Sequence, residues 1–280
     1  MYMSEVQIRI ICFVIVISVI AAWEIIAPRR RLTVSKPGRW FTNLTIIFLN
    51  SILLKILFPM AAAGVAVAAQ KHGWGLFNIL QLPNWLSVFT AVLLLDLIIY
   101  LQHVMVHAVP LLWRLHMVHH ADLDYDVTTG LRFHPLEILL SMGIKMAIVA
   151  AFGVPVLAVL IFEITLNGTA MFNHGNIYLP QRLDRYLRLL VVTPDMHRVH
   201  HSVIIRETNS NFGFNFPWWD RLFGTYRNQP VAGHEGMTIG ITPYRTARQV
   251  TLLRLLLLPF VGEPGRYSLK YIGQDPEKIG

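Results

Sequence analysis

The chain has 280 residues, of which 54% are hydrophobic and only 14% charged, whereas soluble domains usually carry about 25% charged residues. This composition excludes a disordered chain and an ordinary soluble domain, and the single cysteine, Cys12, excludes an internal disulfide and a cysteine-ligated zinc or iron–sulfur site. The net charge of +8 indicates anionic lipid headgroups rather than nucleic acid, because the basic residues flank apolar runs.

Three apolar runs predict membrane-spanning helices. Residues 6–27 can cross a hydrocarbon core of about 30 Å, and the run is too long for the short apolar region of a signal peptide. The basic patch in residues 29–39 is expected on the cytoplasmic side by the positive-inside rule. Residues 41–69, interrupted by Lys55 and Pro59, are expected to cross with a tilt or a kink, and residues 86–107 return the chain to the cytoplasm.

The remaining apolar segments predict a hairpin and a surface helix. Residues 136–172 form a long apolar stretch that is broken at Gly153 and Pro155, with arms of fewer than 20 residues. Residues 250–260 are too short to span and contain Arg254, which favours a helix lying on the membrane surface. We therefore predict an all-α, multi-pass integral membrane protein, a bundle of about four crossings with a cytoplasmic, histidine-rich helical cap. The expected divisions are residues 1–85 (transmembrane region), 86–228 (catalytic domain) and 229–280 (membrane-surface tail).

Ten of the twelve histidines fall on the cytoplasmic side of this topology, and His72 and His234 lie apart in loops. Two predicted helices carry matching polar stripes toward that side, because their polar residues step by i+3 and i+4 and so share one helix face. We expect Asp96, Glu163 and Asn167 on these stripes to orient imidazole rings by accepting their N–H groups. The stripes are Asp96, Tyr100, His103 and His107 in one helix, and Glu163, Asn167, Ala170 and His174 in the other.

The pattern HxxHH occurs twice, at 116–120 and at 197–201. In a helix, positions i, i+3 and i+4 span about 100° of arc, which is enough to address two metal ions from one turn. Many imidazoles without cysteine suit iron, zinc, copper or nickel, and the number present exceeds the four ligands of a structural zinc site. Two irons at the membrane edge suit oxygen activation and attack on a lipid C–H bond.

Several of these segments, in this order, resemble the fatty acid hydroxylase/sterol desaturase superfamily, over about residues 86–226. They are DLIIYLQHVMVH (96–107), HMVHH (116–120), RFHPLE (132–137), NH (173–174), HRVHH (197–201), NFG (211–213) and WWDRLFGTY (218–226). The resemblance implies an integral membrane di-iron oxidoreductase with O2 as co-substrate. It also implies an external electron donor, either a separate electron-transfer protein or a reductant.

Carried over position by position, the resemblance implies a set of histidine ligands for two iron ions, with His134 either a tenth ligand or a residue that supports one. One position departs from the family, because Ala170 stands where some relatives have a histidine or a water-holding asparagine. The implied ligands are His103, His107, His116, His119, His120, His134, His174, His197, His200 and His201.

These observations lead to an expected function with one alternative. We expect a membrane-bound oxygenase that hydroxylates or desaturates a lipid (a sterol, fatty acyl or ether lipid), with its active site on the cytoplasmic side and no nucleic-acid partner. The alternative is a histidine-rich membrane protein that binds or transports metal, although a transporter places its ligands near the bilayer midplane. Thr128 and Thr129 either line the pocket or cap the helix that begins near Pro135.

Overall fold

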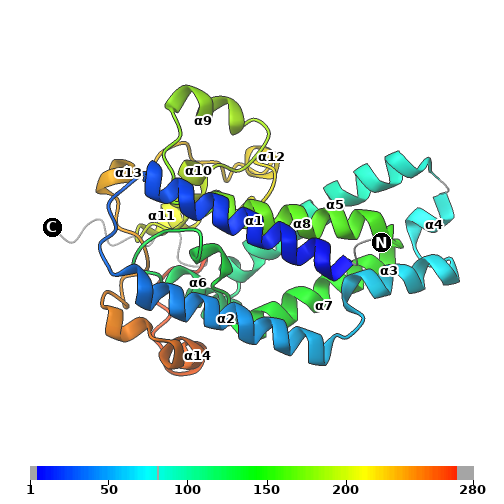
Figure 1. Cartoon of the computed structure of the whole chain (residues 1–280), viewed down its shortest axis with the longest axis horizontal. Helices are drawn as coiled ribbons and strands as arrows, with labels where there is room; N and C mark the ends of the chain where they lie inside the picture. The colour runs from blue at the N-terminus through cyan, green and yellow to red at the C-terminus, as the bar shows by residue number, and fades with distance from the viewer. Residues whose placement is uncertain (1–4, 81, 270–280) are drawn as a thin grey trace.

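The computed structural model describes residues 5–80 and 82–269, and the secondary structure of this part is helical, without a named strand. Figure 1 shows long helices running side by side, with the short helices α9 to α13 gathered at one end and α4 at the other. The α-helices are α1 (Glu5–Ile26), α2 (Lys36–Leu57), α3 (Ala61–His72), α4 (Leu76–Leu80), α5 (Asn84–Ala108), α6 (Pro110–His120), α7 (Pro135–Phe152), α8 (Val156–Asn173), α9 (Gln181–Leu187), α10 (Pro194–His200), α11 (Ile205–Thr208), α12 (Trp218–Leu222), α13 (Gly233–Gly236) and α14 (Leu252–Val261), and the 3₁₀ turns are η1 (Thr129–Leu131) and η2 (Ala247–Val250).

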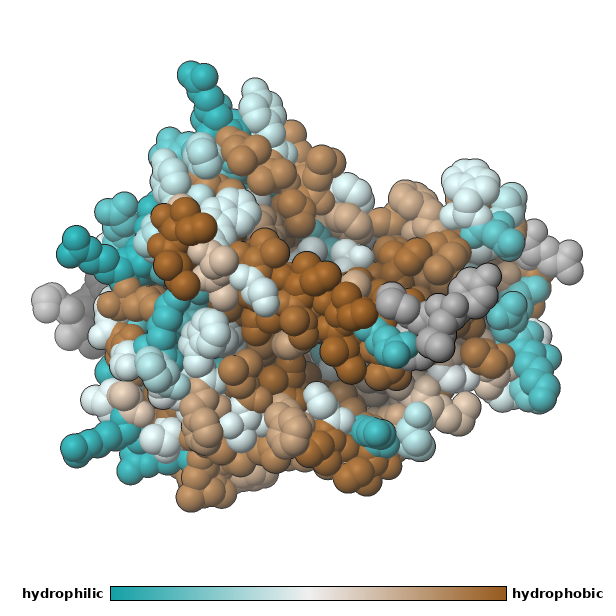
Figure 2. Space-filling view, viewed as in Figure 1, coloured by the Kyte–Doolittle hydropathy of each residue, from teal (hydrophilic) through white to brown (hydrophobic). Residues whose placement is uncertain are grey.

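Five helical stretches are long and apolar enough to cross a membrane: Val6–Ile26, Lys36–Leu80, Asn84–Ala108, Pro135–Phe152 and Val156–Asn173. The protein is therefore a multi-pass membrane protein, as predicted. Hydrophobic residues fill the middle of the face in Figure 2, and hydrophilic residues gather toward its two ends. The bundle is held by α1 and α5 packing on α8, and by α3 packing on α7.

The second stretch is broken where the sequence has its proline. Helix α2 ends at Leu57 and α3 begins at Ala61, with Pro59 in the turn between them. Proline has no backbone N–H and its ring clashes with the preceding helical turn. The predicted kink at this position is therefore confirmed.

The predicted hairpin is also present, as α7 and α8 joined by a tight turn. Gly153 ends α7 in the left-handed conformation, with φ 65°, which costs little only for glycine. A Cβ on Gly153 would lie 2.2 Å from the carbonyl oxygen of Trp74. The turn therefore packs directly on the segment between α3 and α4.

Three charged side chains inside the spans are paired with one another. Glu163 of α8 accepts from Lys145 of α7 at 2.8 Å and from Arg9 of α1 at 2.6 Å. An isolated charge in a hydrocarbon environment is costly, so this contact lets three spans carry ionisable groups. Glu163 therefore pairs with two basic side chains and not with an imidazole ring.

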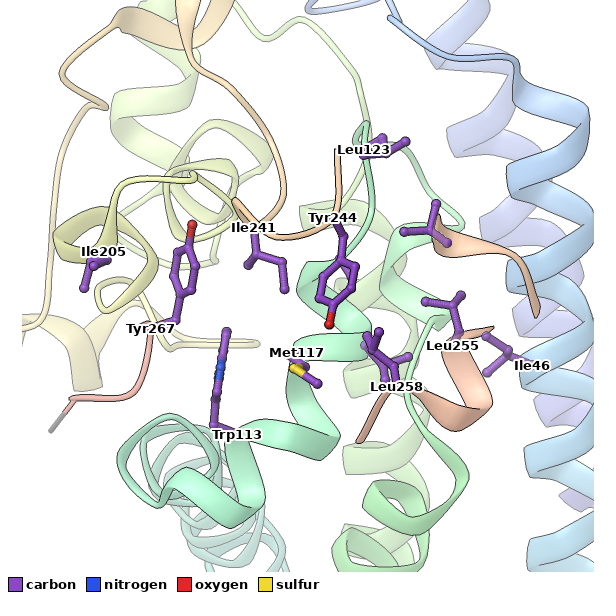
Figure 3. Close-up of a cluster of buried hydrophobic side chains, with 13 residues drawn as sticks. Ile46, Trp113, Met117, Leu123, Ile205, Ile241, Tyr244, Leu255, Leu258 and Tyr267 are labelled. Atoms are coloured by element: carbon purple, nitrogen blue, oxygen red, sulfur yellow. The ribbon is translucent and has the colours of Figure 1, made fainter. Parts of the chain in front are cut away.

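A large hydrophobic cluster joins the C-terminal segment to α6 (Figure 3). Trp113 and Met117 of α6 are buried against Leu255 and Leu258 of α14 and against Tyr267. Helix α14 has one buried face, while Leu253 on its other face is 68% exposed. The helix predicted at residues 250–260 is therefore present, over Leu252–Val261, and its position on the membrane surface stays a prediction.

A buried ionic network fixes the segment between α6 and η1 to the N-terminal helices. Arg39 of α2 donates to both carboxylate oxygens of Asp122, at 2.7 and 2.9 Å, and to Asp126 at 2.7 Å. The Thr129 hydroxyl donates to Asp122 and the Thr128 hydroxyl donates to Asp126. These two threonines therefore serve this network and do not cap α7, so the helix-cap interpretation is wrong.

The α7 N-cap is His134 instead. Its Nδ1 accepts from the backbone N–H of Leu136 at 3.2 Å, and its Nε2 lies 3.2 Å from the carbonyl oxygen of Leu256. This histidine thus joins the start of α7 to α14.

Candidate metal centre

Nine histidines converge at the end of the bundle where the short helices gather. Each of them is at most 3% exposed. Helix α5 contributes two, α6 contributes three, the residue that ends α8 contributes one, and α10 with its C-cap contributes three. They are His103, His107, His116, His119, His120, His174, His197, His200 and His201.

The nine rings form two groups, and within each group the candidate ligand atoms lie within 4.8 Å of one another. The first, the five-histidine group, contains His103, His107, His116, His120 and His200. The second, the four-histidine group, contains His119, His174, His197 and His201. Two separate groups of this size match the number of ligands that two metal ions need.

Four of the nine rings, those of His103, His119, His174 and His200, have a backbone carbonyl oxygen at Nδ1. His103 lies 2.7 Å from the oxygen of Phe212, and His200 lies 2.7 Å from that of Ser210. His174 lies 2.7 Å from the carbonyl oxygen of Ala170 in the preceding helical turn. Because a carbonyl can only accept, Nδ1 carries the proton, and the lone pair of each ring is at Nε2.

Two side chains orient further rings, and neither of them was predicted from the sequence to do so. Glu137 of α7 lies 2.6 Å from His116 Nδ1, and the Asn209 side-chain oxygen lies 3.2 Å from His107 Nδ1. The signal for Glu137 was in the RFHPLE segment, one turn into α7. Nothing in the sequence pattern marked Asn209, because α11 lies about 100 residues after α5 along the chain.

The Nε2 atoms point into the centre and face one another, and no hydrogen-bond donor lies between them. The Nε2 atoms of His103 and His116 lie 3.2 Å apart, as do those of His119 and His174 and those of His174 and His201. The Nε2 atoms of His107 and His200 are buried without a hydrogen-bond partner among the described residues. Lone pairs at this separation repel unless a cation lies between them, so the donor set fits metal ions held between the rings.

Burial favours the neutral form of an imidazole, which is the form that binds metal. Burial, together with the neighbouring imidazoles, holds the pKa of His119, His120 and His200 well below the ordinary value. Burial lowers the pKa of His174 to about 3. These four rings are therefore unprotonated at neutral pH, which leaves their lone pairs available to a cation.

The remaining predicted site residues lie elsewhere. His134 is in neither group and caps α7. Asp96 accepts from the indole N–H of Trp219 at 2.7 Å, and Glu163 holds Arg9 and Lys145. Asn167 is exposed and lines a small cavity of 50 Å³ between α1 and α8. Among the described residues, none of these last three side chains orients an imidazole.

His72 and His234 were expected in loops apart from the other histidines, and His234 differs from this expectation. His72 is exposed and stacks on Trp74. His234 is buried, with its Nε2 3.5 Å from Asp195 at the start of α10, and burial lowers its pKa to about 3. His234 therefore supports α10 from outside the two groups.

Gly130 makes room for the four-histidine group. A Cβ at this position would lie 2.5 Å from the Ala170 carbonyl oxygen and 3.0 Å from His174 Nδ1. Ala170, the position that departs from the resembled family, thus contributes its backbone oxygen to the orientation of His174.

Aromatic side chains exclude water from the centre. The Phe212 ring lies 5.1 to 5.4 Å from those of His103, His107 and His200, measured between centroids. Phe133 stacks on His119 at 4.3 Å. Asp220 holds the segment that carries Phe212 by accepting from the backbone N–H groups of Phe212 and Gly213, both at 2.8 Å. Phe212 and Phe133 thus cover the rings of the centre.

Comparison with known proteins finds a fatty acid hydroxylase family model and relatives that act on lipids. Residues 88–225 match the family model for fatty acid hydroxylase. The ornithine lipid hydroxylase OlsE of Rhizobium tropici is 28% identical over 273 residues, which cover 94% of this chain and 78% of that protein. Alkylglycerol monooxygenases of Xenopus tropicalis and Homo sapiens are 29% and 27% identical, over 65% and 74% of this chain. The matches span 40% and 44% of those two proteins. No solved structure matches significantly.

Proposed function

Since the chain belongs to the fatty acid hydroxylase/sterol desaturase superfamily of lipid oxidoreductases, we propose that it is a membrane-bound di-iron oxygenase that hydroxylates or desaturates a lipid C–H bond with O2 and external electrons. The observation that carries this proposal is the pair of buried imidazole groups, five rings and four, at the end of an apolar bundle.

The ligand chemistry supports two redox-active ions. Imidazole suits iron, zinc and copper alike, and the family resemblance favours iron. A zinc hydrolase needs few histidines with a carboxylate base beside the metal. Here both groups consist of histidines only, and the carboxylate that contacts them, Glu137, is engaged with His116 Nδ1, so the donor set favours oxygen chemistry over hydrolysis.

The chain's own residues position the metals and control what reaches them. The nine histidines would hold two iron ions, and those ions would supply the binding and reduction of O2. Backbone carbonyls hold the Nδ1 protons of four rings, and Glu137 and Asn209 hold those of His116 and His107. These six rings would therefore present their Nε2 atoms without reorganisation. Phe212 and Phe133 keep bulk water off the rings, which protects a reactive centre from side reactions.

The substrate enters from the membrane side under this proposal. The spans that carry His103 and His174 lead directly from the hydrocarbon layer to the two groups. The names of the relatives make ornithine lipids and alkylglycerols the first substrates to test. Hydroxylation at an ether-linked carbon would cleave the ether, so both substrates fit one type of oxidation.

We further propose the membrane orientation, the electron-donating partner and the division of the chain that the sequence favoured. The histidine end would face the cytoplasm, next to the basic residues 29–39, and a separate electron-transfer protein or reductant would supply electrons there. Residues 86–228 would form the catalytic unit, with residues 1–85 as the membrane region and 229–280 as the surface tail. A metal transporter is disfavoured, because both groups gather at one end of the helices rather than at mid-span.

Metal content and oxygen-dependent turnover test the proposal together. Full-length protein purified anaerobically and reconstituted with ferrous iron should hold about two irons per chain, as in other two-metal sites. It should then oxidise a lipid from a panel of ornithine lipids, alkylglycerols, sterols and fatty acyl lipids when O2 and a reductant are present. The matched control is the zinc-loaded protein, which should be inactive. One iron or none in a folded protein, or turnover without O2, would contradict the proposal.

A further inference from the structure

The lobe formed by α9 and α12 exposes apolar side chains outside the five candidate spans. The Trp218 indole N–H donates to the Leu189 carbonyl oxygen at 2.7 Å, so α12 packs on the end of α9, and Figure 1 shows both helices on one side of the bundle. Six apolar residues of this lobe, here called the α9–α12 surface, are between 38% and 69% exposed. They are Leu183, Tyr186, Leu189, Leu190, Trp218 and Leu222.

Helix α9 buries an ion pair and exposes its apolar residues. Asp184 pairs with Arg188 on the buried side, and Arg188 also donates to the Asn228 carbonyl oxygen at 2.7 Å. Leu183 and Tyr186, spaced i and i+3, share the exposed face. A helix surrounded by water buries its apolar stripe, whereas a segment surrounded by lipid turns ionisable groups inward and pairs them. The arrangement of α9 therefore indicates lipid.

The lobe also lies beside the middle of a span, which is a second and independent indication of lipid. The Trp219 indole N–H donates to Asp96 at 2.7 Å, and Asp96 is at the centre of the 25-residue α5. Phe223, which is exposed, stacks on Tyr100 of α5 at 5.4 Å between ring centroids. Since α5 is long and apolar enough to cross a membrane, the exposed side of α12 lies at a level where lipid surrounds the bundle.

The charged residues of the lobe fit the headgroup layer of a membrane. No acid of α9 or α12 is exposed, because Asp184 and Asp220 are both buried. Arg182 and Arg185 are exposed on α9. A long arginine side chain can lie along an apolar surface while its guanidinium reaches a lipid phosphate. The lobe therefore offers apolar side chains and cations together, which is the combination that the boundary between acyl chains and headgroups requires.

We infer that the α9–α12 surface is inserted into the interfacial layer of the membrane that the bundle spans, with Arg182 and Arg185 at the lipid phosphates. Tyr186 and Trp218 belong to the residue types that are enriched at this boundary. Helix α14, which lies across the bundle from α9 in Figure 1, is predicted at the membrane surface by its sequence. The lobe and α14 would then contact lipid on two sides of the bundle. This inference concerns membrane contact and does not require the oxygenase activity.

Fluorescent labelling of the full-length protein tests the inference. Leu183→Cys and Leu222→Cys are made separately in a Cys12→Ser background, because Cys12 is the single cysteine of the chain, and each is labelled with an environment-sensitive fluorophore. Each protein is placed in nanodiscs of phosphatidylcholine that hold one copy. Two quenchers are compared, iodide in the water and a phosphatidylcholine that carries a nitroxide near the top of its acyl chain. Thermal unfolding of each variant confirms that it folds.

Both labels should emit at a shorter wavelength than in water, lose fluorescence to the nitroxide lipid and be protected from iodide, as expected about 5–10 Å into the boundary between headgroups and acyl chains. Ile161→Cys, an exposed position of α8, is the control for lipid contact. Gln229→Cys, in the loop after α12, is the control for water, because Gln229 is exposed and lies outside the α9–α12 surface.

The inference is overturned if the labels at positions 183 and 222 respond to the two quenchers as the label at position 229 does. It is also overturned if the nitroxide lipid has no effect and the labels are protected only when copies associate in detergent, since the surface would then be an interface between copies. Lipid turnover by a protein with water-exposed labels would overturn this inference alone. Inserted labels in a folded protein without turnover would overturn the proposed function alone.

Discussion

The two HxxHH segments have the same spacing and divide their histidines in opposite ways. In the α6 segment, His116 and His120 join the five-histidine group and His119 joins the four-histidine group. In the α10 segment, His197 and His201 join the four-histidine group and His200 joins the five-histidine group. Within the arc of about 100° that these positions span, i+3 lies at one edge, whereas i and i+4 lie toward the other. Two such segments packed together can therefore each give histidines to both metal positions.

The two segments differ in how they are held. The α6 segment lies on an 11-residue helix, where Glu137 orients His116 and the Arg132 carbonyl orients His119. The α10 segment lies on a seven-residue helix with a Thr193 cap, and it is fixed by the ion pair of Asp195 and Arg198. The same motif is therefore supported by packing in the α6 segment and by a local cap and an ion pair in the α10 segment.

Removing one i+3 histidine from each segment should have the largest effect. His119→Ala leaves three ligands in its group, whereas His200→Ala leaves four, so we expect about one iron per chain in the first variant and nearly two in the second. Turnover should fall by more than about 100-fold in both, because oxygen activation needs both ions in place. Metal analysis and O2-dependent lipid oxidation provide the measurements.

The control for this pair is His72→Ala, which removes an exposed ring far from the groups in sequence and should retain wild-type metal content. His134→Ala is informative as well, because His134 lies outside both groups and should keep two irons. If His200→Ala lost both ions while His119→Ala kept two, the division into groups would be wrong.

Gly130→Ala should give the next largest effect, limited to the four-histidine group. The added Cβ would meet the Ala170 oxygen and His174 Nδ1, and such overpacking costs about 1–3 kcal/mol. We expect a lower unfolding temperature and loss of one iron. Gly143→Ala is the matched control, since a Cβ there meets nothing within 4 Å. Equal behaviour of the two variants would show that the contact at Gly130 is unimportant.

Glu137→Ala should weaken only the five-histidine group. Loss of the group that orients a metal-binding imidazole typically lowers metal affinity about 10–100-fold, and Glu137→Gln, which keeps an acceptor oxygen, should lose less. Competition with a chelator measures the affinity of each site. Glu263→Ala, an exposed acid on the C-terminal segment, serves as the control. A Glu137→Ala protein that keeps wild-type affinity would mean that His116 needs no such partner.

Thr193→Ala should have the smallest effect, and only on α10. The Thr193 hydroxyl accepts from the Met196 backbone N–H, and loss of an N-cap of this kind costs about 1 kcal/mol. Thr193→Ser should restore the stability. Thr251→Ala is the control, because Thr251 is the N-cap of α14 without a side-chain cap bond. Thermal unfolding that ranks Thr251→Ala below Thr193→Ala would contradict the role of the cap in holding the α10 segment.

The sequence by itself determined the class of the protein and the composition of the centre. Long apolar runs must become helices in a membrane, because only a helix satisfies its backbone polar groups within one segment. The break at Pro59 and the hairpin turn at Gly153 also follow from local backbone chemistry. The histidine spacing of i, i+3 and i+4 is a local property, so the side of each helix that carries its rings could be predicted.

The tertiary structure alone decided which ring joins which group and what orients it. Four of the orienting acceptors are backbone carbonyls that every residue possesses, so the pattern of side chains carries no sign of them. Asn209 reaches His107 only because the residue that ends α11 lies beside α5 in the fold. Asp96 and Glu163 share a helix stripe with histidines, yet Trp219, Arg9 and Lys145 lie closer to them in the folded chain. A helix face fixes the direction of a side chain, but its partner depends on which distant segment packs against that face.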